Sequence, residues 1–86
     1  MKSNKKLFIS VDVLLKYGIV KSYIIAFLLD KGSYTSNVDS FAREMNNVAC
    51  FGHARDSIRS LMKMGIVERV IYDGRTSRFS INKKAL

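Results

Sequence analysis

The sequence contains no proline and no tryptophan, and it has only one cysteine and one histidine. A single cysteine, Cys50, excludes a disulfide within the chain and a CxxC metal framework. The single histidine, His53, has no second histidine or cysteine at ligand spacing and leaves little capacity for general acid–base chemistry. There is also no Ser/His/Asp set and no phosphate-binding glycine-rich loop. We therefore expect no enzyme activity, no cofactor and no metal site.

Long hydrophobic runs are absent as well. The longest, residues 23–29, is far shorter than the roughly 20 residues of a membrane-spanning helix. The basic start of the chain is followed by a stretch too short and too mixed for the apolar part of a signal peptide. Together with the low cysteine content, this predicts a cytoplasmic protein that does not bind membranes.

Acidic residues are few: seven Asp and Glu stand against fifteen Lys and Arg, for a net charge of +8. Such an excess indicates a polyanionic partner, nucleic acid before lipid, although basic composition alone can reflect no more than solubility. The 86 residues are 48% hydrophobic, which predicts one folded domain over residues 1–86, with a disordered basic arm at 1–6. Because so short a chain buries little surface alone, a homodimer is expected.

The clearest amphipathic pattern lies in residues 52–65. Its apolar side carries Ala54, Ile58 and Leu61 at helical spacing, and Gly65 is suited to end a helix. The opposite side is polar and mostly basic, and it holds Asp56, Arg59, Ser60 and Lys63, with His53 at its edge. We predict a helix at about residues 53–64 that presents a basic face.

Three further segments have helical patterns. Residues 11–18 predict a short helix, Ile19–Lys31 an apolar helix buried on most sides, and residues 38–45 a helix with one apolar stripe. Residues 33–37 are polar and turn-like. Within them Ser36 stands at the first position of a capping-box pattern and is the predicted N-cap residue.

Past Gly65 the hydrophobic period changes to that of a β-strand. The two predicted strands are residues 66–72 and Ser77–Ile81. A two-residue turn between them would place Arg69 opposite Arg78, a pair of like charges. We therefore predict a four-residue loop, which places Val70 opposite Phe79.

This order of elements resembles the winged-helix (winged helix-turn-helix) family over the larger part of the chain. The residues that carry the resemblance are Phe41-Ala42-Arg43-Glu44-Met45, the spacing Ala54…Ile58…Leu61, and Met64-Gly65-Ile66-Val67-Glu68-Arg69 running into Asp73-Gly74-Arg75. The start of the chain is loosely similar to winged-helix domains of phage and plasmid replication-initiation proteins. In the turn, Cys50-Phe51-Gly52 departs from the usual Ser/Arg/Thr cluster, and the turn is longer than usual.

The resemblance implies an α+β fold of three or four helices, including a helix-turn-helix, followed by a two-stranded antiparallel wing. The helix at 53–64 would enter the major groove of duplex DNA, and the wing at 67–81 would lie on the backbone or minor groove. Arg59 is the first candidate for a base edge. The implied contact residues are His53, Arg55, Asp56, Arg59, Ser60, Lys63, Arg75, Arg78, Ser36 and Asn37.

The expected function is sequence-specific binding of double-stranded DNA by a small transcriptional regulator from a mobile element, as a homodimer through residues 7–31. Two alternatives stay open. One is an accessory protein for plasmid or phage replication. The other is a winged helix that binds a polymerase, a helicase or another acidic protein partner, because fold does not fix function.

Overall fold

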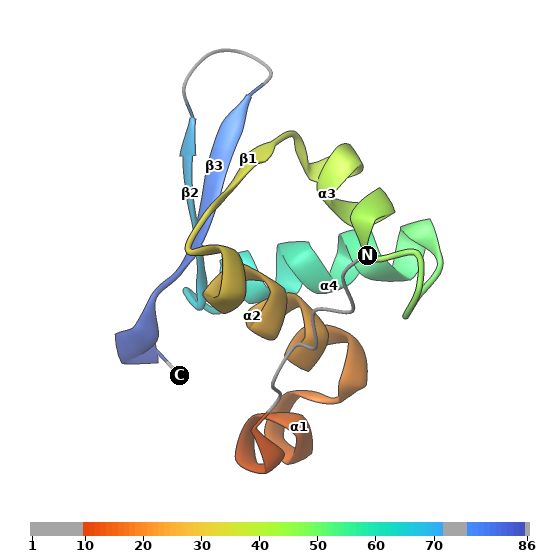
Figure 1. The fold of residues 1–86 in the computed structure, drawn as a ribbon, viewed down its shortest axis with the longest axis vertical. Helices are drawn as coiled ribbons and strands as arrows, with labels where there is room; N and C mark the ends of the chain where they lie inside the picture. Colours follow the sequence, from red (N-terminus) through yellow and green to blue (C-terminus); the bar gives the residue numbers. More distant parts are fainter. Residues whose placement is uncertain (1–9, 72–75, 86) are drawn as a thin grey trace, which may run out of the picture.

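The computed structural model describes residues 10–71 and 76–85. Its elements are α1 (Val11–Tyr17), α2 (Ile19–Lys31), β1 (Tyr34–Ser36), α3 (Val38–Glu44), α4 (Phe51–Lys63), β2 (Val67–Ile71), β3 (Ser77–Ile81) and the 3-10 turn η1 (Lys83–Ala85). The strands form one antiparallel sheet in the order β1–β3–β2. In Figure 1 the sheet stands at the upper left, α4 crosses the middle, and α1 lies at the bottom. The predicted α+β class is confirmed, whereas the predicted basic arm at 1–6 and Arg75 lie outside the described residues.

α2 is the most buried helix, as its apolar sequence predicts. Five consecutive residues, 24–28, are buried, so no side of its middle turn faces water. The helix begins and ends at glycines with positive φ. At Gly32, φ is 80° and the N–H donates to the carbonyl of Leu28 over 2.8 Å. At Gly18, φ is 83°, which lets the chain change direction sharply between α1 and α2.

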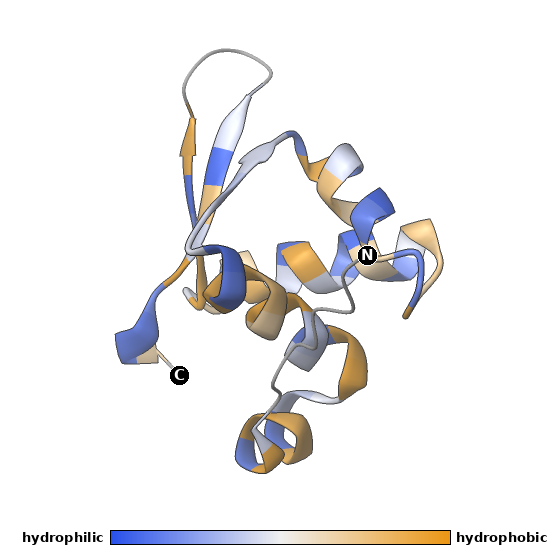
Figure 2. Ribbon diagram, viewed as in Figure 1, coloured by the Kyte–Doolittle hydropathy of each residue, from blue (hydrophilic) through white to orange (hydrophobic). Residues whose placement is uncertain are grey.

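Four aromatic rings join the helices to the sheet. The ring centroids of Phe27 and Tyr34 are 5.4 Å apart, those of Tyr34 and Phe41 are 5.1 Å apart, and those of Phe41 and Phe79 are 5.0 Å apart. These rings come from α2, β1, α3 and β3, so one cluster ties four elements together. Aromatic pairs at such separations add to the stabilisation from burial alone. The hydropathy colouring in Figure 2 shows α2 among other apolar segments at the centre.

The sheet has a third strand that the sequence analysis missed. Residues 33–37 were predicted as a polar turn, but Tyr34–Ser36 pairs with β3 as β1, with Tyr34 opposite Phe79. The expected two-stranded sheet is therefore a three-stranded one. The physical reason is tertiary: Tyr34 packs its ring on Phe27 and Phe41, which brings the backbone beside the free edge of β3.

The strand register of the hairpin also differs from the prediction. Val70 lies opposite Arg78 and Arg69 opposite Phe79, one residue away from the predicted pairing of Val70 with Phe79. Facing residues in an antiparallel pair point to the same side of the sheet, so a one-residue slip exchanges its two faces. In the observed register, the buried residues Val67 and Phe79 share the face that covers the helices.

The start of α3 corrects the predicted N-cap. The cap is Asn37, whose side-chain oxygen accepts the backbone N–H of Ser40 at 2.7 Å. Ser36, the predicted cap, belongs to β1, and its hydroxyl donates to the carbonyl of Asn37 at 2.8 Å. Pairing of residue 36 with Ser77 in the sheet holds it outside the helix, so the capping role moves one residue along.

Candidate nucleic-acid interface

α4 is the element that presents most of the predicted contact residues. It begins at Phe51, two residues earlier than predicted, because Cys50 is extended at the N-cap position and its carbonyl accepts the N–H of Ala54 at 2.9 Å. Its buried residues are Ala54, Ser57, Ile58 and Leu61. The three apolar ones were predicted to face inward, and they do. Ser57 is an addition: it lies at i+3 from Ala54 on the same side of the helix, but its side chain is polar and does not mark an apolar stripe.

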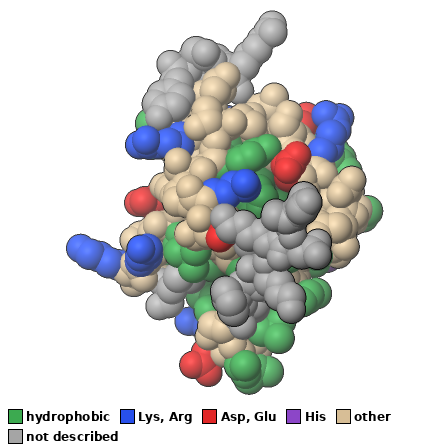
Figure 3. Space-filling model, viewed as in Figure 1, with side chains coloured by type: hydrophobic (Ala, Val, Ile, Leu, Met, Phe, Trp, Pro, Cys, Tyr) green, Lys and Arg blue, Asp and Glu red, His purple; other side chains and the backbone are tan. Residues whose placement is uncertain are grey.

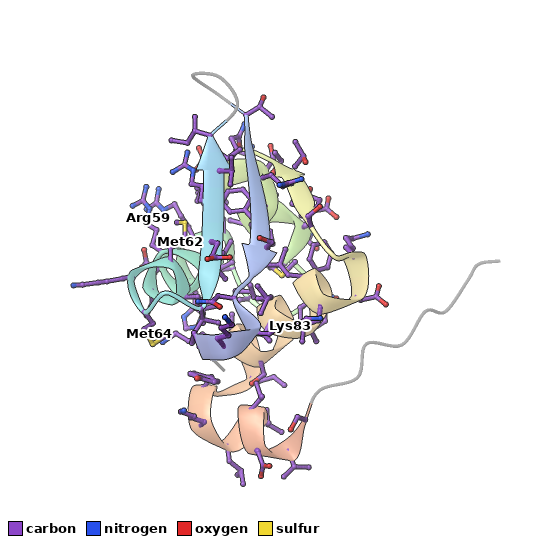
Figure 4. The ribbon with its side chains drawn as sticks, turned by 90° about the vertical axis from the view of Figure 1, so that its left-hand side faces the viewer. Arg59, Met62, Met64 and Lys83 are labelled. Carbon is purple, nitrogen blue, oxygen red and sulfur yellow. The ribbon has the colours of Figure 1, made fainter. Side chains whose placement is uncertain are left out.

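The opposite side of α4 is exposed. Arg59 and Lys63, with His53 and Asp56, are exposed, while Arg55 and Ser60 are half-buried. At 100° per residue, Asp56, Arg59 and Lys63 stand opposite the buried stripe. Figure 4 shows Arg59 and Met62 beside β2, so the basic side of α4 and the β2–β3 hairpin border the same surface. The spacing of side chains along α4 thus produces a solvent-facing basic ridge next to the sheet.

Arg55 does not project freely as a phosphate contact would. Its guanidinium carbon lies 5.5 Å from the ring centroid of Phe51, and that of Arg43 lies 5.2 Å from the same ring. The Nε of Arg55 is buried without a hydrogen-bond partner among the described residues. Arg55 therefore belongs to a cluster with Phe51 and Arg43, which comes from the last turn of α3. Sequence reasoning missed Arg43 because its contact with α4 is tertiary.

The hairpin carries two arginines with different environments. Arg78 is exposed in the middle of β3, on the face of the sheet opposite Phe79. Arg69 extends over the buried face: its Nε donates to the hydroxyl of Ser77 at 2.8 Å, and its guanidinium carbon is 5.9 Å from the ring centroid of Phe79. Of the two wing residues predicted to touch DNA, Arg78 is thus on the surface, and Arg75 is outside the described residues.

The backbone N–H groups of Ser36 and Asn37 were predicted to contact a phosphate at the start of α3. Both side chains already have local partners, the carbonyl of Asn37 and the N–H of Ser40 respectively. α3 has only seven residues, and its first turn contains Asp39, whose charge opposes an anion. The structure places Ser36 in β1 and Asn37 at the N-cap of α3.

A pocket lies on the other flank of α4, toward the start of α2. It is open, has a volume of about 450 Å³, and is lined by Tyr17, Gly18, Ile19, Val20, Lys21, His53, Asp56, Ser57 and Ser60. Three predicted contact residues, His53, Asp56 and Ser60, thus meet the first turn of α2 there. Sequence reasoning did not single out Lys21. The available signal was Gly18, which precedes the predicted helix and has no side chain to cap it.

Among the described residues, the clear pKa change is at Tyr34. Burial raises the pKa of its hydroxyl, and the negative charge of Glu44 raises it further. This group lies in the aromatic cluster, away from the basic side of α4, so it concerns stability.

Within residues 10–71 and 76–85, no three His, Cys, Asp or Glu side chains are grouped in a way that would hold a metal ion. In the same ranges, no helix has the length and apolar character needed to cross a bilayer. Comparison with protein-family models, with curated proteins and with solved structures finds no match to this chain.

Proposed function

We propose that this protein binds double-stranded DNA in a sequence-specific manner, as a small cytoplasmic transcriptional regulator carried by a mobile element. In this proposal the fold is a winged helix, α3 and α4 form its helix-turn-helix, and β2 and β3 form its wing. The element order α2–β1–α3–α4–β2–β3 is compatible with that assignment.

The observation that carries the proposal is the exposed basic side of α4. Arg59 and Lys63 face solvent from the side opposite Ala54, Ile58 and Leu61, which are fully buried. A helix of this kind fits the major groove, where an arginine can donate two hydrogen bonds to guanine. Lys63, near the end of α4, would contact phosphate, as would the wing.

The net charge of +8 supports the same partner. Cations that neutralise phosphates release condensed counterions, so binding strength depends steeply on salt. If four to six Lys and Arg side chains make such contacts, the log–log slope of affinity against salt is about −4 to −5.

The experiment is selection of bound sequences from a random duplex pool, followed by salt titration of the selected duplex. We expect an enriched sequence and a slope near that value. If no duplex is retarded even at low salt, the DNA proposal is wrong.

One observation favours the alternative of a protein-binding module. Met64 at the end of α4 and Val70 and Ile71 on β2 are exposed apolar side chains, and α4 packs against β2. An acidic partner protein, such as a polymerase or helicase subunit, whose contact surface has an apolar centre would bind these side chains and the basic ridge together. A role as a replication accessory protein would use the same DNA contacts as the regulator.

A further inference from the structure

Two arginines from different helices share one aromatic ring where α3 meets α4. The guanidinium carbon of Arg43, in the last turn of α3, lies 5.2 Å from the ring centroid of Phe51. That of Arg55, just past the first turn of α4, lies 5.5 Å from the same centroid. The two carbons are therefore no farther apart than the sum of these distances. Each cation is attracted to the ring, and the two cations repel each other.

No carboxylate balances this pair of charges in the part of the chain that the structure describes. The acidic residues nearest in sequence are Asp39, Glu44 and Asp56, and within that part of the chain none of them forms an ion pair with either arginine. Glu44 acts instead on the hydroxyl of Tyr34, whose pKa it raises. Because an arginine stays charged in proteins, loss of a proton cannot relieve the repulsion. The pair therefore favours an anion from outside the chain.

The guanidinium of Arg55 also has an unsatisfied donor. Its Nε is buried and has no hydrogen-bond partner among the described residues, although the side chain as a whole is half-buried. The Nη groups of Arg55 also have no acceptor within residues 10–71 and 76–85, but they are not covered as Nε is. A charged donor without an acceptor is unfavourable, and here the accessible donors are those that an anion can reach.

The cluster continues the basic side of α4. Arg55 is followed at i+4 by Arg59 and at i+8 by Lys63, so the three cations follow one row of the helix over about 12 Å. Arg43 extends this row onto α3. A row of cations suits the backbone of a nucleic acid, which carries one negative charge on each regularly spaced phosphate.

We propose that Arg43, Phe51 and Arg55 form a phosphate clamp, in which Phe51 holds the two guanidinium groups near one another and both donate hydrogen bonds to one phosphate group of the DNA backbone. The choice of DNA rests on the proposed function, and the continuity with Arg59 and Lys63 supports it. Arg55 takes part from its place beside the ring instead of projecting freely. Because the ring gathers the cations before the ligand arrives, less ordering remains for the binding step.

Matched substitutions separate the charges from the ring and from the fold. Arg43→Gln and Arg55→Gln each remove one charge of the clamp. Lys31→Gln is the control: it removes a charge that also lies over a ring, 5.0 Å from the centroid of Phe27, at the end of α2. Phe51→Leu removes the ring and keeps an apolar side chain, whereas Phe51→Tyr keeps the ring. The melting temperatures of both arginine variants should stay within about 4 °C of the wild type, because the removed charges repel each other.

The first measurement is duplex affinity by fluorescence anisotropy over a range of salt concentrations. Arg43→Gln and Arg55→Gln should each weaken binding about tenfold and reduce the log–log salt slope by about one. Because the two side chains share a phosphate, the double variant should bind more tightly than the loss of about a hundredfold that independent contacts would give. Lys31→Gln should bind within about twofold of the wild type.

The ring variants test the role of Phe51. Phe51→Leu should weaken duplex binding about fivefold without changing the salt slope, because both charges remain while the ring no longer holds them together. Phe51→Tyr should bind like the wild type. If the duplex binds strongly but both arginine variants bind like Lys31→Gln, or if their effects are independent, the clamp is wrong and the DNA function stands.

The second measurement follows the Nε–H signals of Arg43 and Arg55 by NMR while the whole chain is titrated with duplex DNA, inorganic pyrophosphate or a glutamate-rich peptide. Saturable shifts of both signals with the duplex, much weaker in Phe51→Leu, support the clamp. If pyrophosphate shifts both signals while the wild type binds no duplex, the phosphate site stands with a free phosphorylated molecule as its source, and the DNA function is wrong. If the peptide alone shifts them, or if no titrant does, the phosphate clamp is wrong.

Discussion

Under the proposed function, Arg59 is the cation of α4 that would read a base edge. It is exposed, it stands opposite the buried stripe of its helix, and it lies beside β2 (Figure 4). Arg55, by contrast, is half-buried and lies against Phe51. The difference between these two arginines is one of position on the helix, since their side chains are chemically identical.

We expect Arg59→Ala to relax sequence preference more than it lowers general duplex affinity. Loss of a bidentate contact to guanine costs about 1–3 kcal/mol of discrimination. The melting temperature should hardly change, because the side chain is exposed. Affinities for the selected duplex and for a scrambled one, measured at one salt concentration with Lys31→Ala as the control, test this. Equal weakening on both duplexes would make Arg59 a phosphate contact.

Tyr34 gives the protein a pH dependence on the alkaline side. Burial, and then the charge of Glu44, raises the pKa of its hydroxyl above the value of 10.0 for a free tyrosine. As pH rises, the unfolded chain therefore loses this proton before the folded chain does. The resulting stability is fully present below about pH 10 and is lost as pH rises through the raised pKa.

We expect the free energy of unfolding to fall more steeply between pH 9 and 11 in the wild type than in Tyr34→Phe. Lysines also titrate in this range, so the difference between the two proteins is the quantity to measure, by urea unfolding at each pH. Equal slopes would show that this hydroxyl has an ordinary pKa in the folded state.

At the scale of elements, the cap of α3 tests where that helix begins. Asn37→Ala should lower the free energy of unfolding by about 1 kcal/mol, because it removes the acceptor for the N–H of Ser40. Ser36→Ala should stay within about 0.5 kcal/mol of the wild type, since that hydroxyl is not a cap. Urea unfolding of both variants checks the ranking. The opposite ranking would return the cap to Ser36.

The elements that sequence patterns predicted well are those long enough to show a hydrophobic period. Ile19–Lys31 and Ser77–Ile81 have the bounds that their patterns indicated. Tyr34–Ser36 was missed because three residues are too few to show a period, and because its partner β3 is distant in sequence. The hairpin register was wrong because like-charge avoidance was weighed above the burial of Val67 beside Phe79.

The features of the candidate site also fall into those that the sequence predicts and those that it does not. The exposure of Arg59 and Lys63 follows from helical period alone, so the sequence predicted it. The cluster of Arg43 with Phe51, and the pocket joining Lys21 to Ser57, depend on how separate helices pack. No local pattern contains that information.

At the scale of the whole molecule, α1 exposes much apolar surface. It has no buried residue, and within it Leu15 is 80% and Val11 68% exposed, while Ile19, the first residue of α2, is 57% exposed. Figure 2 shows this apolar helix at the end of the molecule away from the hairpin, and Figure 3 shows hydrophobic side chains gathered at that end. A homodimer through residues 7–31 would remove this surface from water.

We expect light scattering to give twice the 9.8 kDa mass of the chain at high concentration. Leu15→Glu should restore the single-chain mass without lowering the melting temperature, because the side chain is exposed in one chain. Asp12→Asn, which alters the same short helix without a new charge, serves as the control. If the wild type keeps the single-chain mass at high concentration, the proposed interface is wrong.

The outer position of β2 has a consequence for behaviour in concentrated solution. Within the described part of the chain, its one neighbour in the sheet is β3, so its outer side is an edge that a strand from another molecule can join. Adjacent charges at Glu68 and Arg69 interrupt what would otherwise be an apolar β-branched segment, and the bond from Arg69 to Ser77 keeps the cation in place. We expect those two charged side chains to oppose edge-to-edge pairing between molecules, and we expect high ionic strength to weaken that effect.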